Sequence, residues 1–185
     1  MSAFKLENVL TDDLPTRVTF ATEIGRSGIK RCAEIGVLAG GFSKVLCENI
    51  LDITLYCVDP WTVSRNHRSQ RRLERQYRET KNLMRDYNAV IMRMTSLEGA
   101  KIIPDNSLDM VYIDALHDYE NVKADILAWE PKVVPGGIIS GHDWKHFGVT
   151  KAVQECALLF GIKHIYTTCE DPKEIHPSWF WRKAE

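Results

Sequence analysis

The chain has 185 residues, 44% of them hydrophobic, and its 24 Lys and Arg residues nearly balance its 25 Asp and Glu residues. This length is enough for one domain with a buried core, and the near-neutral charge argues against nucleic acid or an anionic membrane as a partner. The polar N-terminus lacks the features of a signal peptide, and no apolar run approaches the roughly 20 residues that span a bilayer.

The five cysteines are scattered along the chain, and none belongs to a CxxC pair. Cys32 and Cys57 lie in expected buried strands, where cysteine packs as a small hydrophobic side chain. A disulfide framework or a zinc site is therefore not expected. A reducing, cytoplasmic environment fits this cysteine usage best.

Hydrophobic periodicity predicts a helix over residues 12–25, with Thr11 or Asp12 as its cap, followed by alternating strands and helices. The strands are expected at residues 31–35, 53–58, 89–92, 108–114, 137–140, 163–167 and 179–182. The helices are expected at residues 41–50, 66–85, 96–101, 119–130 and 148–160. This alternation predicts an α/β domain whose mostly parallel sheet carries helices on both faces.

A glycine loop joins the first two of these strands. Glu34 lies near the end of the first strand, Gly36 and Gly40 follow in a GxxxGG pattern, and Asp59 ends the second strand just before Trp61. An open α/β sheet uses this order to build an adenosine-binding crevice. The GxGxxG loop that approaches a pyrophosphate is absent, so the pattern suits a ligand such as S-adenosylmethionine. The glycines alone are equally compatible with a tight turn, and the two acids favour a ligand.

A second group of polar residues follows the expected strands at residues 108–114 and 137–140. Asp114 ends a very apolar run, His117 lies three residues later, and His142 and Asp143 follow the second strand. If these strands are adjacent, the four side chains converge at the carboxyl edge of the sheet. Such a group can bind a divalent metal or supply a general base, although the histidines could equally order the loops.

Four motifs in this order resemble those of the class I S-adenosylmethionine-dependent methyltransferases. They are Glu34-Ile-Gly-x-x-x-Gly40, Val58-Asp-Pro-Trp61, Val111-Tyr-Ile-Asp-Ala-x-His-x-Tyr119 and Trp129-x-Pro-x-x-x-Pro-Gly-Gly-x-x-x-Gly-His-Asp143. The likeness spans about residues 31–160 and is greatest to a small bacterial branch with IDAxHxY and PGGxxxGHD motifs.

The resemblance implies a Rossmann-like three-layer sandwich with a seven-stranded sheet of order 3-2-1-4-5-7-6. Its last strand would be antiparallel, and residues 178–183 are well placed to supply it. In such a structure residues 1–28 would form an N-terminal helical extension. Residues 29–185 would form the Rossmann-like core of the single domain.

The resemblance also assigns the cofactor site. The residues expected to bind S-adenosylmethionine are Glu34, Gly36, Gly40, Asp59, Trp61, Ser96 and Asp114. Asp59 would accept hydrogen bonds from the ribose hydroxyls. Trp61 could equally pack in the core, and Ser96 could equally cap a helix.

The expected catalytic residues are Asp114, His117 and His142. Methyl transfer is an in-line displacement at a sulfonium carbon, and an alcohol or phenol acceptor gains from a base or from a metal that stabilises the oxyanion. Metal-dependent relatives take an acid, an acid, and an amide or a further acid from these strand ends, whereas this chain offers Asp114, His142 and Asp143. We therefore expect O-methylation, and whether a divalent cation such as Mg²⁺ assists it stays open.

A basic stripe lies in the expected helix at residues 66–85. Its members recur at three- or four-residue steps and share one helical face: Arg68, Arg71, Arg75 and Arg78. Pairing of Glu74 with Arg78 and of Arg75 with Glu79 would make this face an ordinary solvated surface. The alternative is that the stripe borders the acceptor site and attracts a phosphate- or carboxylate-bearing substrate.

The leading hypothesis is an S-adenosylmethionine-dependent methyltransferase that acts on a small molecule, such as a sugar, a phenol or a natural-product intermediate. A nicotinamide-dependent oxidoreductase is an alternative, but the chain lacks both GxGxxG and a second catalytic domain. A non-catalytic nucleotide-binding protein of the same fold is another. The balanced charge disfavours DNA or RNA as a partner, and a homo-oligomer stays open.

Overall fold

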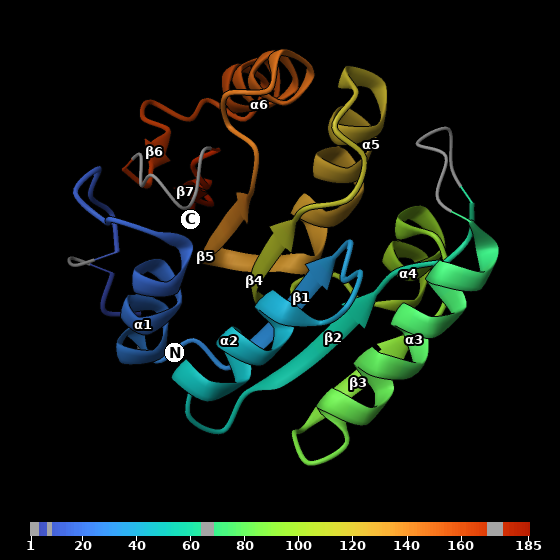
Figure 1. Cartoon of the computed structure of the whole chain (residues 1–185). Coiled ribbons are helices and arrows are strands. Elements are labelled where there is room, and N and C mark those ends of the chain that lie inside the picture. The colour runs from blue at the N-terminus through green and yellow to red at the C-terminus, as the bar shows by residue number, and fades with distance from the viewer. Residues whose placement is uncertain (1–3, 7–8, 64–68, 170–175) are drawn as a thin grey trace.

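The computed structural model describes residues 4–6, 9–63, 69–169 and 176–185, which fold into one α/β unit (Figure 1). Its strands are β1 (Arg31–Ile35), β2 (Thr54–Val58), β3 (Ala89–Met92), β4 (Leu108–Ile113), β5 (Val133–Gly141), β6 (Tyr166–Thr167) and β7 (Trp179–Arg182). Its α helices are α1 (Arg17–Ser27), α2 (Gly41–Asn49), α3 (Gln70–Met84), α4 (Ser96–Ile102), α5 (Tyr119–Trp129) and α6 (Phe147–Leu159).

The strands form a seven-stranded sheet of order β3-β2-β1-β4-β5-β7-β6, which confirms the expected order. β1 pairs in parallel with β2 and β4, and β4 pairs in parallel with β5. β7 is antiparallel to β5 and β6, as expected of the last strand. Because parallel strands end at the same edge of a sheet, the loops after β1, β2, β4 and β5 are neighbours.

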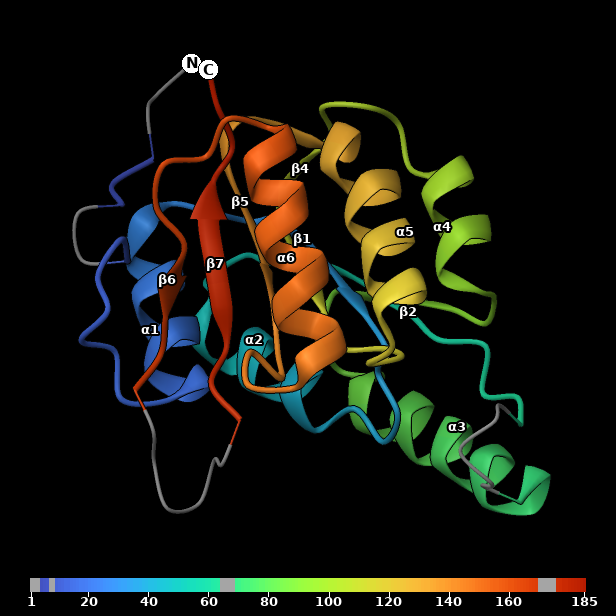
Figure 2. The same cartoon turned by 90° about the horizontal axis from the view of Figure 1, so that it is seen from above.

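Helices cover both faces of the sheet. α1, α2 and α3 lie on one face, and α4, α5 and α6 lie on the other (Figures 1 and 2). The side chains of β4 alternate between these layers: Met110 and Tyr112 belong to one hydrophobic core, and Val111 and Ile113 belong to the other. Burial on both faces explains why this strand is a continuous apolar run in the sequence.

The helix α1 is part of the first of these cores, since its Phe20 and Ile24 are fully buried in the same cluster as Tyr112. It begins at Arg17, later than the expected residue 12. Pro15 disfavours a helical conformation in the residue before it, so the helix starts after the proline.

The cap of α1 is Thr16, whose side chain accepts a hydrogen bond from the Thr19 N–H at 3.2 Å. The expectation that Thr11 or Asp12 caps this helix was therefore wrong. The carboxylate of Asp12 instead accepts a hydrogen bond from the Thr167 N–H at 2.9 Å and fixes the chain beside β6.

The other expected elements are present, several of them with shifted ends. β5 begins at residue 133 rather than 137, and β6 spans two residues where five were expected. The expected start of α3 at residue 66 lies outside the described residues, and α3 begins after Ser69, whose side chain accepts a hydrogen bond from the Arg72 N–H.

None of the helices in the described part of the chain is long and apolar enough to cross a membrane. Cys32 and Cys57 are buried free thiols, as expected.

A buried carboxylate fixes the start of β1 against β4. Asp109 is 5% exposed, and its Oδ2 accepts hydrogen bonds from the N–H groups of Lys30 at 2.9 Å and Arg31 at 2.8 Å. Its Oδ1 pairs with the Arg31 guanidinium at 2.9 Å. The acid therefore satisfies two backbone donors where the central strand begins.

Replacing Asp109 by alanine should lower the free energy of unfolding by about 3 kcal/mol, because it removes charge-assisted hydrogen bonds and leaves backbone donors without an acceptor. Urea denaturation measures this loss. Asp105→Ala is the matched control, since Asp105 is 63% exposed and pairs with Lys132 at the surface. The control should change stability by less than about 1 kcal/mol. Equal losses in the two variants would contradict the bracing role of Asp109.

Candidate active site

A cavity of about 690 Å³ opens at the carboxyl edge of the sheet, beyond the ends of β1, β2 and β4. Its wall contains the glycine loop after β1, Asp59 after β2, residues 95–97 at the start of α4, and residues 114–117 after β4. Glu34, Gly36 and Asp59 of the first group of residues that the sequence singled out therefore share one cavity with Asp114 and His117 of the second. Its volume falls within the range of small-molecule and cofactor sites.

Asp59 shapes the glycine loop. Its Oδ2 accepts hydrogen bonds from the N–H groups of Val37 at 3.0 Å and Leu38 at 2.9 Å, and its Oδ1 accepts one from the Trp61 N–H at 2.7 Å. A carboxylate has about four acceptor positions, so roughly one remains for a ligand hydroxyl. Asp59 lines the cavity where a ribose was expected, but the loop already uses most of its hydrogen-bonding capacity.

The two glycines of the loop serve different purposes. Gly36 has φ +92°, and a Cβ on it would lie 2.1 Å from the backbone oxygen of Asp114. Gly40 has φ +78° and precedes the first turn of α2. At Gly36 the absence of a side chain thus allows the ends of β1 and β4 to approach each other.

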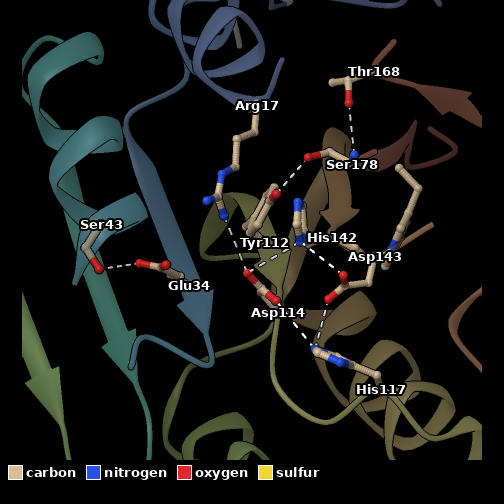
Figure 3. A network of polar contacts seen from close by, with 11 residues as sticks. Arg17, Glu34, Ser43, Tyr112, Asp114, His117, His142, Asp143, Thr168 and Ser178 are labelled. Carbon is tan, nitrogen blue, oxygen red and sulfur yellow. Dashed lines mark hydrogen bonds and ion pairs between the residues drawn. The ribbon is translucent and has the colours of Figure 1, made fainter. Parts of the chain in front are cut away.

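Glu34 lies under the loop, 2% exposed, and its carboxylate accepts a hydrogen bond from the Ser43 hydroxyl of α2 (Figure 3). Burial raises the pKa of Glu34 to about 8, and this outweighs the lowering effect of the Ser43 hydrogen bond. The side chain therefore holds a proton near neutral pH. A cation placed in the cavity would favour its ionised form.

Trp61 lies outside the cavity wall. It is fully buried, its Nε1 donates to the Leu38 oxygen at 2.7 Å, and its ring lies 5.0 Å from that of Tyr77. Trp61 adopts a positive φ of 45°, which its neighbours must stabilise. The side chain therefore packs in the core behind the glycine loop, which is one of the two roles that the sequence allowed.

Ser96 does line the cavity, but it does not cap α4. The cap is Thr95, which forms a capping box with Glu98. The Ser96 hydroxyl accepts a hydrogen bond from the Trp129 indole at 2.9 Å and is also hydrogen-bonded to Asp125. Its orientation is thus set by two residues of α5.

The structure brings together the four polar residues after β4 and β5 (Figure 3). His117 Nε2 lies 2.9 Å from Asp143 Oδ2 and 3.8 Å from Asp114 Oδ1. His142 Nδ1 lies 3.5 Å from Asp143 Oδ1 and 3.9 Å from Asp114 Oδ2. The predicted convergence is therefore confirmed by the geometry.

The ligand atoms suited to a metal belong to Asp114, His117 and Asp143, and lie within 4.8 Å of one another. This set has His117 in the place that the sequence analysis gave to His142. Asp143 has a positive φ of 59°. In this conformation its Oδ2 contacts His117 and its Oδ1 contacts His142.

The interactions of His117 with Asp114 and Asp143 raise the pKa of its imidazole to about 10. Burial would raise the pKa of Asp143, but hydrogen bonds from His117 and His142 outweigh it and hold that pKa below its usual range. At neutral pH the cluster therefore consists of a histidine cation between carboxylates.

The basic stripe lies on α3, beside the cavity wall contributed by Leu73. A shallow hollow of about 500 Å³ is lined by Ser69, Arg71, Arg72, Arg75 and Arg78. Arg68 lies outside the described residues. Arg75 pairs with Glu79 at 3.4 Å as expected. Arg78 also interacts with Glu74, but its Nε donates to the backbone oxygen of Glu74 at 3.4 Å. The Glu74 carboxylate binds Arg93 at 2.5 Å instead, because Arg93 after β3 reaches across to α3.

Two charged residues of the cavity wall were not predicted from the sequence. Arg17, the first residue of α1, has its guanidinium 3.8 Å from Asp114. Asp125 of α5 is 5% exposed, and burial raises its pKa to about 6 despite the hydrogen bond from Ser96. Asp125 lies on the apolar face of its helix between Val122 and Ile126, a signal that was available. Arg17 had no comparable signal.

The seven-stranded sheet of this order, with a glycine loop and a strand-end acid at its carboxyl edge, is the fold that the sequence motifs implied. Residues 33–144 match the profile of the family described as "Methyltransferase domain". The match covers more than half of the chain, so the chain belongs to this methyltransferase family.

Solved structures with the same fold include O-methyltransferases. One from Bacillus cereus, in complex with SAH, is 15% identical, with 96% of this chain and 85% of that chain covered and a TM-score of 0.66. A candidate O-methyltransferase from Klebsiella pneumoniae is 16% identical, with coverages of 91% and 80% and a TM-score of 0.66. Spermidine synthase from Thermotoga maritima is 15% identical, with coverages of 89% and 57% and a TM-score of 0.62. These likenesses show the fold.

A curated relative is matched over a shorter stretch. The chain is 38% identical over 73 residues to the uncharacterized protein y4gI of Sinorhizobium fredii. This stretch makes up 37% of the chain and 8% of that protein. The chain therefore spans a small part of the length of this relative.

Glu34→Gln should flatten the dependence of stability on pH in the ligand-free protein. The folded-state pKa of about 8 lies above the unfolded value near 4.5, so the stabilisation is complete below about pH 4.5 and is lost as pH rises toward 8. We expect the wild type to lose on the order of 3 kcal/mol between pH 5 and pH 8 relative to the variant, measured by urea denaturation. Glu48→Gln, at an exposed position of α2, should keep the wild-type slope. A variant slope equal to that of the wild type would contradict the protonated state of Glu34.

Proposed function

We propose that this chain is an S-adenosylmethionine-dependent methyltransferase that methylates an oxygen of a small-molecule acceptor. The observation that carries the proposal is the single cavity whose wall holds the Asp59-braced glycine loop together with Asp114 and His117. Sugars, phenols and natural-product intermediates are acceptors of this class. The solved O-methyltransferases of the same fold support the reaction type, and the IDAxHxY and PGGxxxGHD motifs support the narrower branch.

In this proposal the cofactor extends across the ends of β1, β2 and β4. Its ribose lies at Asp59, its adenine lies near Ser96, and its amino acid part lies over Gly36 beside Asp114. Gly40 at the start of α2 faces α3 instead, where a Cβ on it would lie 3.3 Å from the Thr80 side chain. Glu34 beneath the loop contributes a buried carboxyl group that a cationic cofactor would favour in its charged form.

The acceptor end is formed by Asp114, His117 and His142. Because His117 holds its proton near neutral pH, it is suited to stabilise negative charge on an acceptor oxygen rather than to remove a proton. His142, 13% exposed beside both carboxylates, is the residue we propose as proton acceptor. The transferred methyl group needs only a positioned nucleophile and a site that excludes water.

Asp114, His117 and Asp143 have the donor chemistry of a divalent-cation site. Their convergent ligand atoms are two carboxylate oxygens and one imidazole nitrogen. Mg²⁺ prefers oxygen donors, so an imidazole in the set favours Mn²⁺ or Zn²⁺ over the expected Mg²⁺. When bound, such a cation would stabilise an acceptor oxyanion. Without it, the protonated His117 holds the same two carboxylates together.

Cofactor binding tests the proposed function. Isothermal titration calorimetry should show saturable binding of S-adenosylhomocysteine and no saturable binding of NAD⁺. Asp59→Ala should weaken S-adenosylhomocysteine binding by about tenfold or more, because it removes a ribose acceptor and three loop hydrogen bonds. Asp86→Ala, at a position 79% exposed, is the control and should bind as the wild type does. Binding of NAD⁺ in place of S-adenosylhomocysteine would contradict the proposal and support an oxidoreductase.

Metal binding is tested separately, without an acceptor. Mn²⁺ should bind the wild type, and Asp143→Asn and His117→Ala should each lose at least about tenfold in affinity. His146→Ala is the control, since His146 lies beside His117 with ring centroids 5.7 Å apart but is outside the set. Affinity should rise with pH, because the cation displaces the His117 proton. No binding of Mn²⁺ or Zn²⁺ to the wild type would leave the cluster as an ion-pair network and exclude the metal-assisted version.

A further inference from the structure

We propose that the arginine-lined hollow on α3 is a second ligand site, separate from the cavity at the carboxyl edge of the sheet, and that it binds a small molecule through a diphosphate group. The hollow has a volume of about 500 Å³ and is lined by Ser69, Arg71, Arg72, Arg75 and Arg78. The proposed methyl transfer uses none of these residues.

The first turn of α3 separates the hollow from the cavity. Leu73 lines the cavity, whereas Arg71 and Arg72 of the same turn line the hollow. Arg75 and Arg78 share the helical face of Arg71, and Leu73 lies on the opposite face. α3 is the outermost helix of its layer (Figure 2), and the four arginines are exposed. None of the described residues that line the hollow also lines the cavity, so the hollow can hold a ligand of its own.

The positive charge of the hollow is concentrated and only partly neutralised. α3 contains five Lys or Arg residues and two Glu residues, in a chain whose net charge is −1. Of the two glutamates, Glu79 pairs with Arg75, whereas the Glu74 carboxylate binds Arg93 after β3. In the described part of the chain, the two arginines of the first turn form no ion pair with a carboxylate. The hollow therefore attracts anions.

This arrangement is unfavourable for the helix itself. The first turn of α3 contains two arginines and no acidic residue. The positive end of a helix dipole favours acidic residues in the first turn and disfavours cations. Arg71 and Arg75, and likewise Arg75 and Arg78, are also like charges one turn apart, which lowers helix stability. Residues that break local rules in this way are expected where a function requires them.

The chemistry of the guanidinium group selects the ligand. One guanidinium can bind two oxygens of a phosphate through parallel N–H donors, so several guanidiniums around one hollow match an anion with several charges and closely spaced oxygens. A diphosphate is such an anion. The volume of the hollow falls within the range of small-molecule sites, which leaves room for the group that carries the diphosphate. The acidic side chains of the cavity would repel the same anion.

Isothermal titration calorimetry with inorganic pyrophosphate tests the site, without divalent cations and at about 0.15 M salt, where long-range attraction between exposed charges is largely screened. The wild type should show saturable binding, at least about tenfold tighter than that of orthophosphate, because pyrophosphate engages more guanidiniums. The double variant Arg71→Ala/Arg75→Ala should lose at least about tenfold in affinity for pyrophosphate. Arg85→Ala is the matched control and should bind as the wild type does, since Arg85 is 74% exposed at the other end of α3 and lies outside the hollow.

Urea denaturation separates a binding role of these arginines from a structural one. Because Arg71 lies at the unfavourable end of the helix dipole, ligand-free Arg71→Ala should unfold at the same urea concentration as the wild type or at a higher one. Pyrophosphate should raise the unfolding midpoint of the wild type and leave that of the double variant unchanged. A lower midpoint for ligand-free Arg71→Ala would assign the arginines to helix stability and overturn the inference.

The absence of saturable pyrophosphate binding to the wild type, or an equal loss of affinity in Arg85→Ala, would also overturn the inference. Binding of a single-stranded oligonucleotide without binding of pyrophosphate would assign this face to nucleic acid and exclude the small-molecule site. All of these outcomes leave the proposed function intact, because S-adenosylhomocysteine should bind the wild type and the double variant equally in the cavity on the other side of α3.

Discussion

The site depends on how closely the backbones of β1 and β4 approach at their carboxyl ends. The Asp114 N–H donates to the Ile35 oxygen at 2.7 Å, and a Cβ on Gly36 would lie 2.1 Å from the Asp114 oxygen. Gly36 leads into the loop that Asp59 holds, and Asp114 begins the segment that carries His117. A side chain at position 36 would therefore displace the proposed cofactor and acceptor ends together, because one backbone contact fixes both.

The cavity also gathers acidic side chains in a way that suits a cationic ligand. Burial raises the pKa of Glu34 to about 8 and of Asp125 to about 6, so the ionised forms of these acids are disfavoured in the ligand-free protein. At the opposite end, His117 offsets the charges of Asp114 and Asp143. Burial destabilises the ionised carboxylates of Glu34 and Asp125, and the positive charge of a sulfonium cofactor would stabilise them. The negative charges of a nucleotide rich in phosphate would be repelled by the same carboxylates.

The sequence predicted the scaffold better than the details of the site. β1, β3 and β7 match their expected bounds because short apolar runs bounded by polar residues specify buried strands. The strand-end acids were found for the same reason, since the end of a strand places its last residue at the ligand edge. The hydrogen bonds of Asp59 and the choice of His117 over His142 depend on loop geometry that residue spacing does not encode. Arg17 reaches Asp114 across 97 positions of sequence, and only the packing of α1 brings the two together.

Asp114 couples the two ends of the proposed reaction. Its Oδ2 faces Arg17 and His142, while its Oδ1 faces His117. A change at this carboxylate would therefore alter the orientation of the amino acid part, the charge state of His117 and the position of His142 at once. Its role cannot be assigned from a single substitution. Arg17 and Asp143 lie on either side of it, and each contacts one end of the cluster. Variants of these two flanking residues separate the interactions on the two sides of Asp114, because each removes partners from one side and leaves the central carboxylate in place.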